Sequence, residues 1–264
     1  MDILVCMKQV PDTETKIVIN PQGTGIVTDG IKYVMNPYDE YAVEEALRIK
    51  EKLGGTVTIV CMGPQRSTEA IRTALAMGAD KGVHLNDAAF EGSDSYCTAK
   101  ALAAAIKPLS YGIILSGKQA VDEDNAQVYA ALAELLGISH VSIVTKLDIA
   151  ADGKSAVAQR EVEGAAKEVI QVSLPAVIAC QKGLNEPRYA SLPGIMKAKK
   201  KPIDVVDLAK SGLSAGEAGA KGAKLKNRKY SLPPEREAGK VLEGEPVEVA
   251  AKVVKLLREE AKII

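Results

Sequence analysis

Short, unbroken apolar runs alternate with stretches of helical periodicity along the first half of this chain. Apolar runs of this length are typical of parallel strands that are covered on both faces of a sheet. The helical stretches repeat apolar residues every three or four positions, which gives each helix one apolar face. The order strand, helix, strand, helix predicts a right-handed, doubly wound α/β sheet that is mostly parallel. The predicted strands are 3–7, 57–62 and 113–115, and the predicted helices are 40–53, 67–77, 96–106 and 127–136.

The pattern changes after Gly137. Residues 141–149, 156–162 and 168–180 are predicted to be strands, with turn signals at Asp152-Gly153 and Gly164 between them. Strands joined by such short turns indicate an antiparallel addition to the parallel sheet.

The C-terminal part of the chain is poor in apolar residues until its last segment. Residues 211–224 are rich in Gly, Ala and Ser, so they are expected to be loose unless they lie on another surface. Residues 246–264 place valines and leucines at helical spacing. We therefore expect one α/β domain over 1–203, followed over 204–264 by an extended arm whose final helix packs on a partner subunit. Two domains on one chain is the alternative.

Residues 184–203 read LNEPRYASLPGIMKAKKKPI, which places one leucine between two prolines ahead of a lysine run. Prolines stiffen the loop, and residues 194–200 are predicted to form a short helix with lysines near its negative end. This pattern predicts an apolar knob on a preorganised loop, suited to docking an acidic partner. The alternatives are a leucine that packs into its own domain beside a solvated basic face, or a nucleic-acid contact. The candidate docking residues are Leu192, Pro193, Ile195, Met196, Lys197 and Lys200.

Composition narrows these choices. The chain has 264 residues with 34 basic and 34 acidic side chains, so it has no net charge to attract nucleic acid or an anionic membrane. The lysine run is not interleaved with aromatic residues that could stack on bases. Four scattered cysteines without a CxxC pair predict buried, reduced thiols. No apolar run reaches membrane-spanning length, and the chain begins directly with a strand-like run, so we expect a cytoplasmic protein.

A ligand site is expected beyond the carboxyl ends of the parallel strands, where open α/β sheets bind ligands. The segments that emerge there are the end of the first strand, the turn at 35–39, residues 61–64 and residues 116–127. Gly117 allows a close approach of backbone to ligand, and Asp124 or Asn125 is expected to cap the next helix. That helix start offers free N–H groups to a phosphate. The alternative for 116–125 is a plain capped surface loop.

The sequence contains no familiar catalytic or self-sufficient nucleotide motif. It lacks GxGxxG, GxxxxGK[ST] and GxSxG, and its two histidines have no cysteine or aspartate at catalytic spacing. Three consecutive acids, 122–124, cannot all face one ion from a helix start. We therefore predict neither a metal site nor a catalytic acid, base or nucleophile.

Three segments together resemble one known family. Residues 35–38, 117–127 and 184–201 are similar to the β subunit of electron transfer flavoprotein, and residues 27–31 and 71–80 add to the likeness. The resemblance extends from Ile3 to about Ile203. It implies a heterodimer with an α subunit that carries most of the site for a redox FAD, while this chain holds AMP. The complex would carry electrons from flavin dehydrogenases, such as the acyl-CoA dehydrogenases of fatty acid β-oxidation, to a quinone-linked acceptor oxidoreductase, either membrane-bound or free.

The resemblance also implies roles for residues. Leu192 would anchor in a pocket of the dehydrogenase, and Tyr38 would approach the flavin ring of the α subunit as well as the nucleotide. The implied nucleotide-binding residues are Cys6, Asn36, Pro37, Tyr38, Asp39, Met62, Gly117, Lys118, Gln119, Ala120, Val121, Asp122, Glu123, Asp124, Asn125, Ala126, Gln127 and Val128.

The chain departs from one variant of the family. Members that hold a second FAD in place of AMP, and bifurcate electrons, resemble GDTAQVGP where this chain has EDNAQVYA at 123–130. The shared Ala126-Gln-Val indicates the bifurcating type, whereas Asn125, Tyr129 and the intact 184–201 segment favour the AMP-containing carrier. We favour AMP. The alternatives are a bifurcating β subunit and a stand-alone nucleotide-binding regulator.

Overall fold

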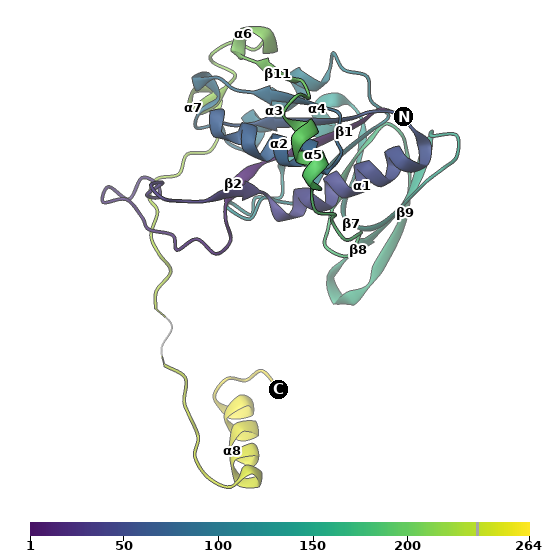
Figure 1. Ribbon diagram of the computed structural model, residues 1–264. Coiled ribbons are helices and arrows are strands. Elements are labelled where there is room, and N and C mark those ends of the chain that lie inside the picture. The colour runs from purple at the N-terminus through teal and green to yellow at the C-terminus, as the bar shows by residue number, and fades with distance from the viewer. Residues whose placement is uncertain (236–237) are drawn as a thin grey trace.

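The computed structural model describes residues 1–235 and 238–264 and contains eleven named strands and eight named α-helices in those ranges. Figure 1 shows most of the helices packed around one central sheet, with the C-terminal helix apart from it. The strands are β1 Ile3–Met7, β2 Gln9–Pro11, β3 Tyr33–Met35, β4 Val57–Met62, β5 Lys81–Leu85, β6 Ile113–Gly117, β7 Ser139–Ile149, β8 Ser155–Glu161, β9 Lys167–Ser173, β10 Ala176–Cys180 and β11 Ile203–Val206. The helices are α1 Pro37–Leu53, α2 Thr68–Met77, α3 Ser95–Ile106, α4 Val128–Leu136, α5 Leu192–Ala198, α6 Leu208–Ser211, α7 Gly219–Gly222 and α8 Pro246–Glu259.

The central sheet has nine strands in the order β11-β5-β4-β1-β6-β10-β7-β8-β9. Every pairing from β11 to β7 is parallel, and the pairings β7-β8 and β8-β9 are antiparallel. The predicted fold class, a mostly parallel α/β sheet with an antiparallel addition and a C-terminal helix, is confirmed. A separate two-stranded ribbon pairs β2 with β3.

Two apolar layers cover the sheet, which explains the unbroken apolar strands. Ile3 and Val5 of β1 pack under α1 and α2, whereas Leu4 and Cys6 pack on the opposite face under α3 and α4. Since both faces of the strand are buried, no position in it tolerates a solvated polar side chain. The apolar area removed from water in these two layers is the main stabilising contribution to the fold.

The structure divides the predicted strand 168–180 into two strands with different partners. β9 is antiparallel to β8, but β10 lies between β6 and β7 and is parallel to both. Pro175 lies between β9 and β10 and has no N–H to donate to a ladder, which separates the two strands. The expectation of one antiparallel strand over this segment is therefore wrong for its second half.

Residues 211–224 differ from the loose segment expected from their composition. They contain α7, and Ala218 is only 2% exposed because it packs into the apolar layer under α3. Lys100 and Glu217 form an ion pair of 2.7 Å, and Asp94 Oδ2 accepts hydrogen bonds from the backbone N–H groups of Lys224 and Leu225. The chain extends away from the sheet only after this anchor, and it ends in α8 (Figure 1).

A cluster of charged groups holds the loop before α5 against α1. The Glu44 carboxylate, 3% exposed, accepts hydrogen bonds from Arg188 Nε at 2.7 Å and from Arg48 Nε at 2.8 Å. Arg188 also pairs with Glu51 at 2.5 Å. Burial raises the pKa of the Glu44 carboxyl, but the bonds from the two arginines outweigh it, so that its pKa lies below the ordinary value. We call Glu44, Arg48, Glu51 and Arg188 the arginine clamp.

The short helix α5 is fixed to α2 along its length. Gly194 lies directly against the Ala76 carbonyl, where any side chain would clash, and Ser191 caps the helix by accepting from Gly194 N–H. At the other end, Arg72 donates to the carbonyls of Ala198 and Lys201. Helix α5 is therefore held at both of its ends.

The arginine clamp predicts that removing Arg188 destabilises the fold more than removing a lysine from an exposed ion pair. Arg188→Ala leaves the buried Glu44 with Arg48 as its remaining charged partner, and should lower the free energy of unfolding by about 2 kcal/mol at neutral pH. Because the folded-state pKa of Glu44 is depressed, this loss should shrink as pH falls below the ordinary glutamate value of 4.5. Urea denaturation at pH 7 and pH 4 measures both effects. Lys146→Ala is the control, since the Lys146–Asp148 pair is largely exposed and should matter by less than about 0.5 kcal/mol.

Candidate functional site

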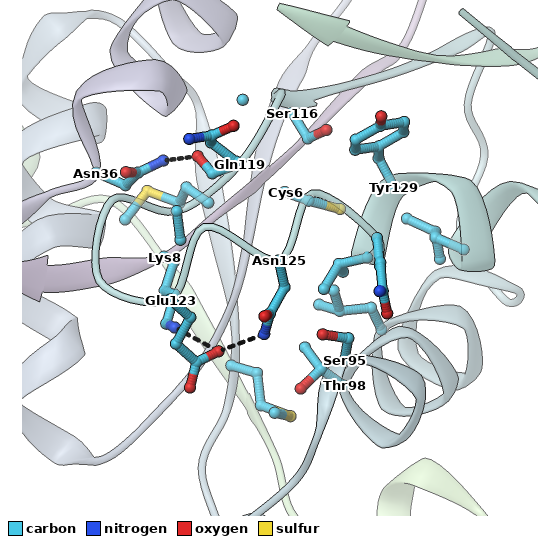
Figure 2. Close-up of a pocket in the computed structure, with 18 of the residues that line it drawn as sticks. Cys6, Lys8, Asn36, Ser95, Thr98, Ser116, Gln119, Glu123, Asn125 and Tyr129 are labelled. Carbon is cyan, nitrogen blue, oxygen red and sulfur yellow. Dashed lines mark hydrogen bonds and ion pairs between the residues drawn. The ribbon is translucent and has the colours of Figure 1, made fainter. Parts of the chain in front are cut away.

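A cavity of about 370 Å³ opens where β1, β4 and β6 end, between these strand ends and the first turns of α3 and α4 (Figure 2). This is the position where the chain order of the sheet changes direction and where open α/β sheets bind ligands. The predicted residues that line it are Cys6, Asn36, Asp39, Met62, Gly117, Lys118, Gln119, Ala120, Glu123, Asn125, Ala126, Gln127 and Val128.

Five residues of the predicted set do not line this cavity. Pro37 and Tyr38 lie in the first turn of α1. Lys118 Nζ lies over the Tyr38 ring, 5.0 Å from its centre. Val121, Asp122 and Asp124 belong to the loop after β6 but are absent from the cavity wall. Val121, Asp122 and Asp124 contribute to the shape of the loop.

Two polar side chains at the start of α1 hold that loop in place. Asn36 Nδ2 donates to the Gln119 carbonyl at 2.9 Å (Figure 2). Asn36 Oδ1 accepts from Val121 N–H at 3.1 Å. Asp39 Oδ1 accepts from Gly117 N–H at 2.8 Å, and its Oδ2 accepts from Lys8 N–H at 2.7 Å. Asn36 and Asp39 therefore build the cavity wall as well as bordering it.

Gly117 is required by the packing of α1 against β6. A Cβ at this position would come within 2.5 Å of Asp39 Oδ1 and 2.6 Å of Tyr38 Cβ. Only glycine lets the helix start approach the strand end closely enough for Asp39 to reach both strands.

Asp39 is buried among these groups. Burial raises the pKa of its carboxyl to about 7, although the N–H bonds from Lys8 and Gly117 favour the charged form. The oxygens keep both backbone donors as partners in either protonation state, because a protonated carboxyl still has lone pairs on each oxygen. Burial likewise raises the pKa of the Cys6 thiol far above its usual value, so this cavity residue is an inert, neutral group.

The acids of the loop are used in pairing. Lys8 Nζ lies 2.8 Å from Asp122 Oδ2 and 3.6 Å from Glu123 Oε2, and Gln119 Nε2 donates to Asp124 Oδ1 at 2.6 Å. Asn125 Nδ2 in turn donates to Glu123 Oε2 at 3.2 Å. Asp124 and Ala126, on either side of Asn125, have positive φ, a conformation uncommon for residues other than glycine and typical of tight turns.

Neither Asp124 nor Asn125 caps α4, which corrects the expectation from sequence. The N-cap position belongs to Gln127, and within the described residues no side chain bonds to the first-turn N–H groups there. α4 also has no acidic residue in its first turn. Its positive end therefore opens toward the cavity with backbone donors free to meet an anion.

The opposite wall was missed by sequence reasoning. Ser95 and Thr98, in the first turn of α3, present hydroxyl groups to the cavity (Figure 2). Asp94 caps this helix by accepting from Cys97 N–H at 2.8 Å. The Asp-Ser pair ahead of an alanine-rich stretch signals a helix start, but its place opposite α4 follows only from the tertiary fold. The remaining lining residues, outside the implied nucleotide-binding set, are Met7, Lys8, Phe90, Gly92, Ser93, Leu102, Ser116, Tyr129 and Leu132. Of these, Met7, Lys8 and Ser116 belong to segments that were expected at this edge of the sheet.

The cavity offers groups for holding a ligand. Amides, hydroxyls, backbone N–H groups and two lysines line it, but neither histidine does. His84 is buried, its Nε2 lies 3.0 Å from the Gly63 carbonyl, and burial lowers its pKa. Within residues 1–235 and 238–264, no three His, Cys, Asp or Glu side chains come together as a metal site would require. No helix in the same ranges has the length and apolarity that crossing a bilayer takes.

The predicted docking residues lie on a different part of the molecule, on and just after α5. Leu192 is 75% exposed and Met196 60% exposed, with Ile195 also exposed beside them. Leu192 therefore does not pack into its own domain. Pro193, Lys197 and Lys200 are exposed on the same short segment, which makes it a mixed apolar and basic surface.

Comparison with known proteins agrees with this architecture. The family described as "Electron transfer flavoprotein domain" matches residues 24–211. A protein of Bacillus subtilis (strain 168) named "Electron transfer flavoprotein subunit beta" is 47% identical, and the alignment covers 100% of both chains. One of the same name from Thermoanaerobacterium thermosaccharolyticum is 40% identical over 97% of this chain and 98% of its own length.

A further relative bears a more specific name. The "Caffeyl-CoA reductase-Etf complex subunit CarD" of Acetobacterium woodii is 39% identical, and the alignment covers 98% of each chain. Matches of this identity over whole chains establish the family. The chain therefore belongs to the electron transfer flavoprotein β subunits, electron-transfer proteins that act together with an α subunit.

Proposed function

We propose that the cavity binds AMP, and that the chain completes a site for one FAD held mostly by the α subunit. The observation that carries the proposal is the uncapped start of α4, which opens into a cavity lined by amides and hydroxyls. Backbone N–H groups at a helix start suit a phosphate. Neutral side chains such as Gln119 and Gln127 suit the donors and acceptors of a purine and a ribose.

The charged side chains that line the cavity suit a ligand with one phosphate better than a ligand with several. Two lysines line the cavity, and one of them, Lys8, lies 3.6 Å from the acid Glu123, so the local charge suits a single anionic group. Phosphate at the α4 start would meet Val128 N–H and its neighbours, with Lys8 close to the loop that covers the site. AMP would contribute structure here and no chemistry.

For the flavin, the proposal assigns this chain a positioning part. The FAD, when bound between the subunits, accepts and donates the electrons. Tyr38 is proposed to approach it from the start of α1, where Lys118 over the ring fixes the tyrosine in place. The chain contributes no acid, base or nucleophile to this transfer, and we propose that it acts as an electron-carrier subunit.

We further propose that α5 is the docking element for flavin dehydrogenases, such as acyl-CoA dehydrogenases of fatty acid β-oxidation. Leu192, Ile195 and Met196 supply an exposed apolar anchor, and Lys197 and Lys200 add positive charge. Charge of one sign around a small apolar contact speeds encounter with an acidic partner and leaves the complex short-lived. A quinone-linked oxidoreductase, either membrane-bound or free, is the proposed acceptor, and the cytoplasm is the proposed location.

The arm and α8 are proposed to pack on the α subunit. Val247, Val253 and Val254 of α8 are exposed apolar residues, and α8 stands away from the sheet (Figure 1). An amphipathic helix of this kind gains stability by burying its apolar face against another surface.

One alternative is a bifurcating β subunit with a second FAD in place of AMP. The observation in its favour is that the cavity continues to the hydroxyls of Ser95 and Thr98 beyond the α4 start. The name of the Acetobacterium woodii relative places that protein in a complex with caffeyl-CoA reductase. A stand-alone nucleotide-binding regulator is the alternative of another class, and it would purify without a flavin partner.

The central test identifies the bound nucleotides. The chain is co-purified with its α subunit, the complex is denatured, and the released compounds are separated by chromatography and quantified. We expect one AMP and one FAD per heterodimer. Two FAD and no AMP would establish the bifurcating alternative, and a chain that purifies alone with ATP would establish the regulator.

The docking surface is tested by removing the anchor. Leu192→Ala should slow reduction of the heterodimer by its dehydrogenase about tenfold, because most of one buried leucine contact is lost. Flavin content should stay unchanged. Val169→Ala is the control, since Val169 is an exposed valine on β9, the edge strand at the opposite end of the sheet from β11, which follows α5. Equal transfer rates for wild type and the Leu192 variant would reject docking through α5.

Limited proteolysis tests the arm. Residues 211–225 should resist trypsin with or without the α subunit because they are anchored on α3. Cleavage after Lys226 or Arg228, which are exposed, should be fast in the isolated chain and at least about tenfold slower in the heterodimer. Equal cleavage of both forms after Lys226 would contradict packing of the arm on the partner.

A further inference from the structure

Helix α5 keeps its place with almost no apolar burial of its own. It has seven residues, and only Ala198 among them is buried. Leu192, Ile195 and Met196 are all exposed. An isolated helix of two turns is unstable in water, and most protein helices are stabilised by an apolar face packed against a core. Other contacts must therefore hold α5.

Two cations supply these contacts by acting across the boundary between α2 and α5. Arg72 Nη1, on α2, donates to the carbonyls of Ala198 at 2.5 Å and Lys201 at 2.6 Å, at the C-terminal end of α5. Lys201 Nζ donates in return to the carbonyls of Leu75 at 2.9 Å and Ala79 at 2.6 Å, at the C-terminal end of α2. The last carbonyls of a helix lack partners within it and form its negative end, so each cation stabilises the end of the other helix. We call this exchange the reciprocal cap.

Lys201 differs in this respect from the other lysines of its run. Lys197, Lys199 and Lys200 are exposed, as a solvated basic surface would be. Lys201 is half-buried, and burial lowers the pKa of its ammonium group, as expected for a cation taken from water. Three lysines of the run therefore present their charge to solvent, whereas the fourth uses its donors on α2.

The reciprocal cap fixes the rotation of α5 about its own axis. Arg72 holds carbonyls at one end of the helix, while at the other end Gly194 lies against the Ala76 carbonyl. Figure 1 shows α5 beside α2, in agreement with these contacts. Without the cap, α5 would be free to turn its apolar side chains toward α2, where their burial is favourable. Polar contacts thus keep Leu192 exposed.

We infer that Arg72 and Lys201 are positioning residues for docking, which keep Leu192 exposed by capping each other's helices. The inference rests on the proposed docking function of α5 and deepens it. It divides the basic residues of this region into two groups. Lys197 and Lys200 attract a partner by their charge. Arg72 and Lys201 fix the apolar anchor that the partner binds.

The first test measures docking at high salt, where attraction by charge is screened. Reduction of the heterodimer by an acyl-CoA dehydrogenase, itself reduced with its acyl-CoA substrate, is followed by stopped flow in about 1 M salt, where the screening length is about 3 Å. Arg72→Met and Lys201→Met should each lower the second-order rate constant about fivefold, because the anchor is no longer preorganised. Lys199→Met is the matched control. It removes an exposed charge from the same run and should match wild type at this salt concentration.

A second test separates positioning from general destabilisation. In a Leu192→Ala background, Arg72→Met should have little further effect, because the side chain that it positions is gone. The combined loss should be about tenfold rather than the product of about fiftyfold. Amides of residues 195–201 should exchange with deuterium at least about tenfold faster in Arg72→Met and Lys201→Met than in wild type. Bound flavin per heterodimer should be the same in every variant.

The outcomes separate this inference from the proposed function. If Leu192→Ala reacts as fast as wild type, docking through α5 fails and the inference fails with it. If Leu192→Ala is slow but Arg72→Met and Lys201→Met match the control at high salt, the inference alone is overturned. Losses that multiply in the Leu192→Ala background would also overturn it, as would unchanged amide exchange in α5. Should Arg72→Met not assemble, an unchanged rate in Lys201→Met rejects the inference.

Discussion

The site depends on one buried carboxylate, that of Asp39. Its two oxygens accept N–H groups from the end of β6 and from the residue after β1, so a single side chain ties together two neighbouring strands at the edge where they open. The cost of burying the group is visible in its pKa, raised to about 7. The arrangement is possible because Gly117 leaves room for α1 to approach. Without this contact, the loop that covers the cavity would lose its fixed starting point.

Helix α1 serves two parts of the molecule through two groups of polar side chains. Its first residues fix the loop after β6, and its middle residues, through the arginine clamp, fix the segment that leads to α5. The positions of the cavity loop and of the apolar surface of α5 are thus both fixed by contacts with α1. The buried sheet contributes most of the stability of the fold, and α1 determines where the cavity loop and α5 lie.

The sequence predicted the parts of the fold that depend on local pattern. β1 and β4 were recognisable as short apolar runs, buried throughout except at the half-buried Met62, and α4 was recognisable by its period and by Gly137 at its end. β5 was not, since Gly82 and His84 interrupt its apolar run, and β11 was not, since it is short and half exposed. The small apolar residues of 211–224 looked insufficient for packing, yet Ala218 is buried and a Cβ on Gly222 would come within 3.0 Å of Cys97 Sγ of α3.

Within the candidate site, local signals again had a limit. The loop after β6 was identifiable by its glycine and its acids, but the acids turned out to pair with Lys8 and with loop amides. The wall formed by α3, and the contact between Glu44 and Arg188 across 144 positions of sequence, depend on long-range packing. Nothing in the local pattern specifies such pairs.

The fixed backbone of α5 has a consequence for the kinetics of the docking that we propose for this segment. Arg72, Ser191 and the close Gly194 contact already order this segment. Little conformational entropy of α5 is therefore lost when another protein binds Leu192. The association can then be productive with few contacts, and few contacts keep the dissociation rate high. A rigid docking surface that makes few contacts therefore favours short-lived complexes over long-lived ones.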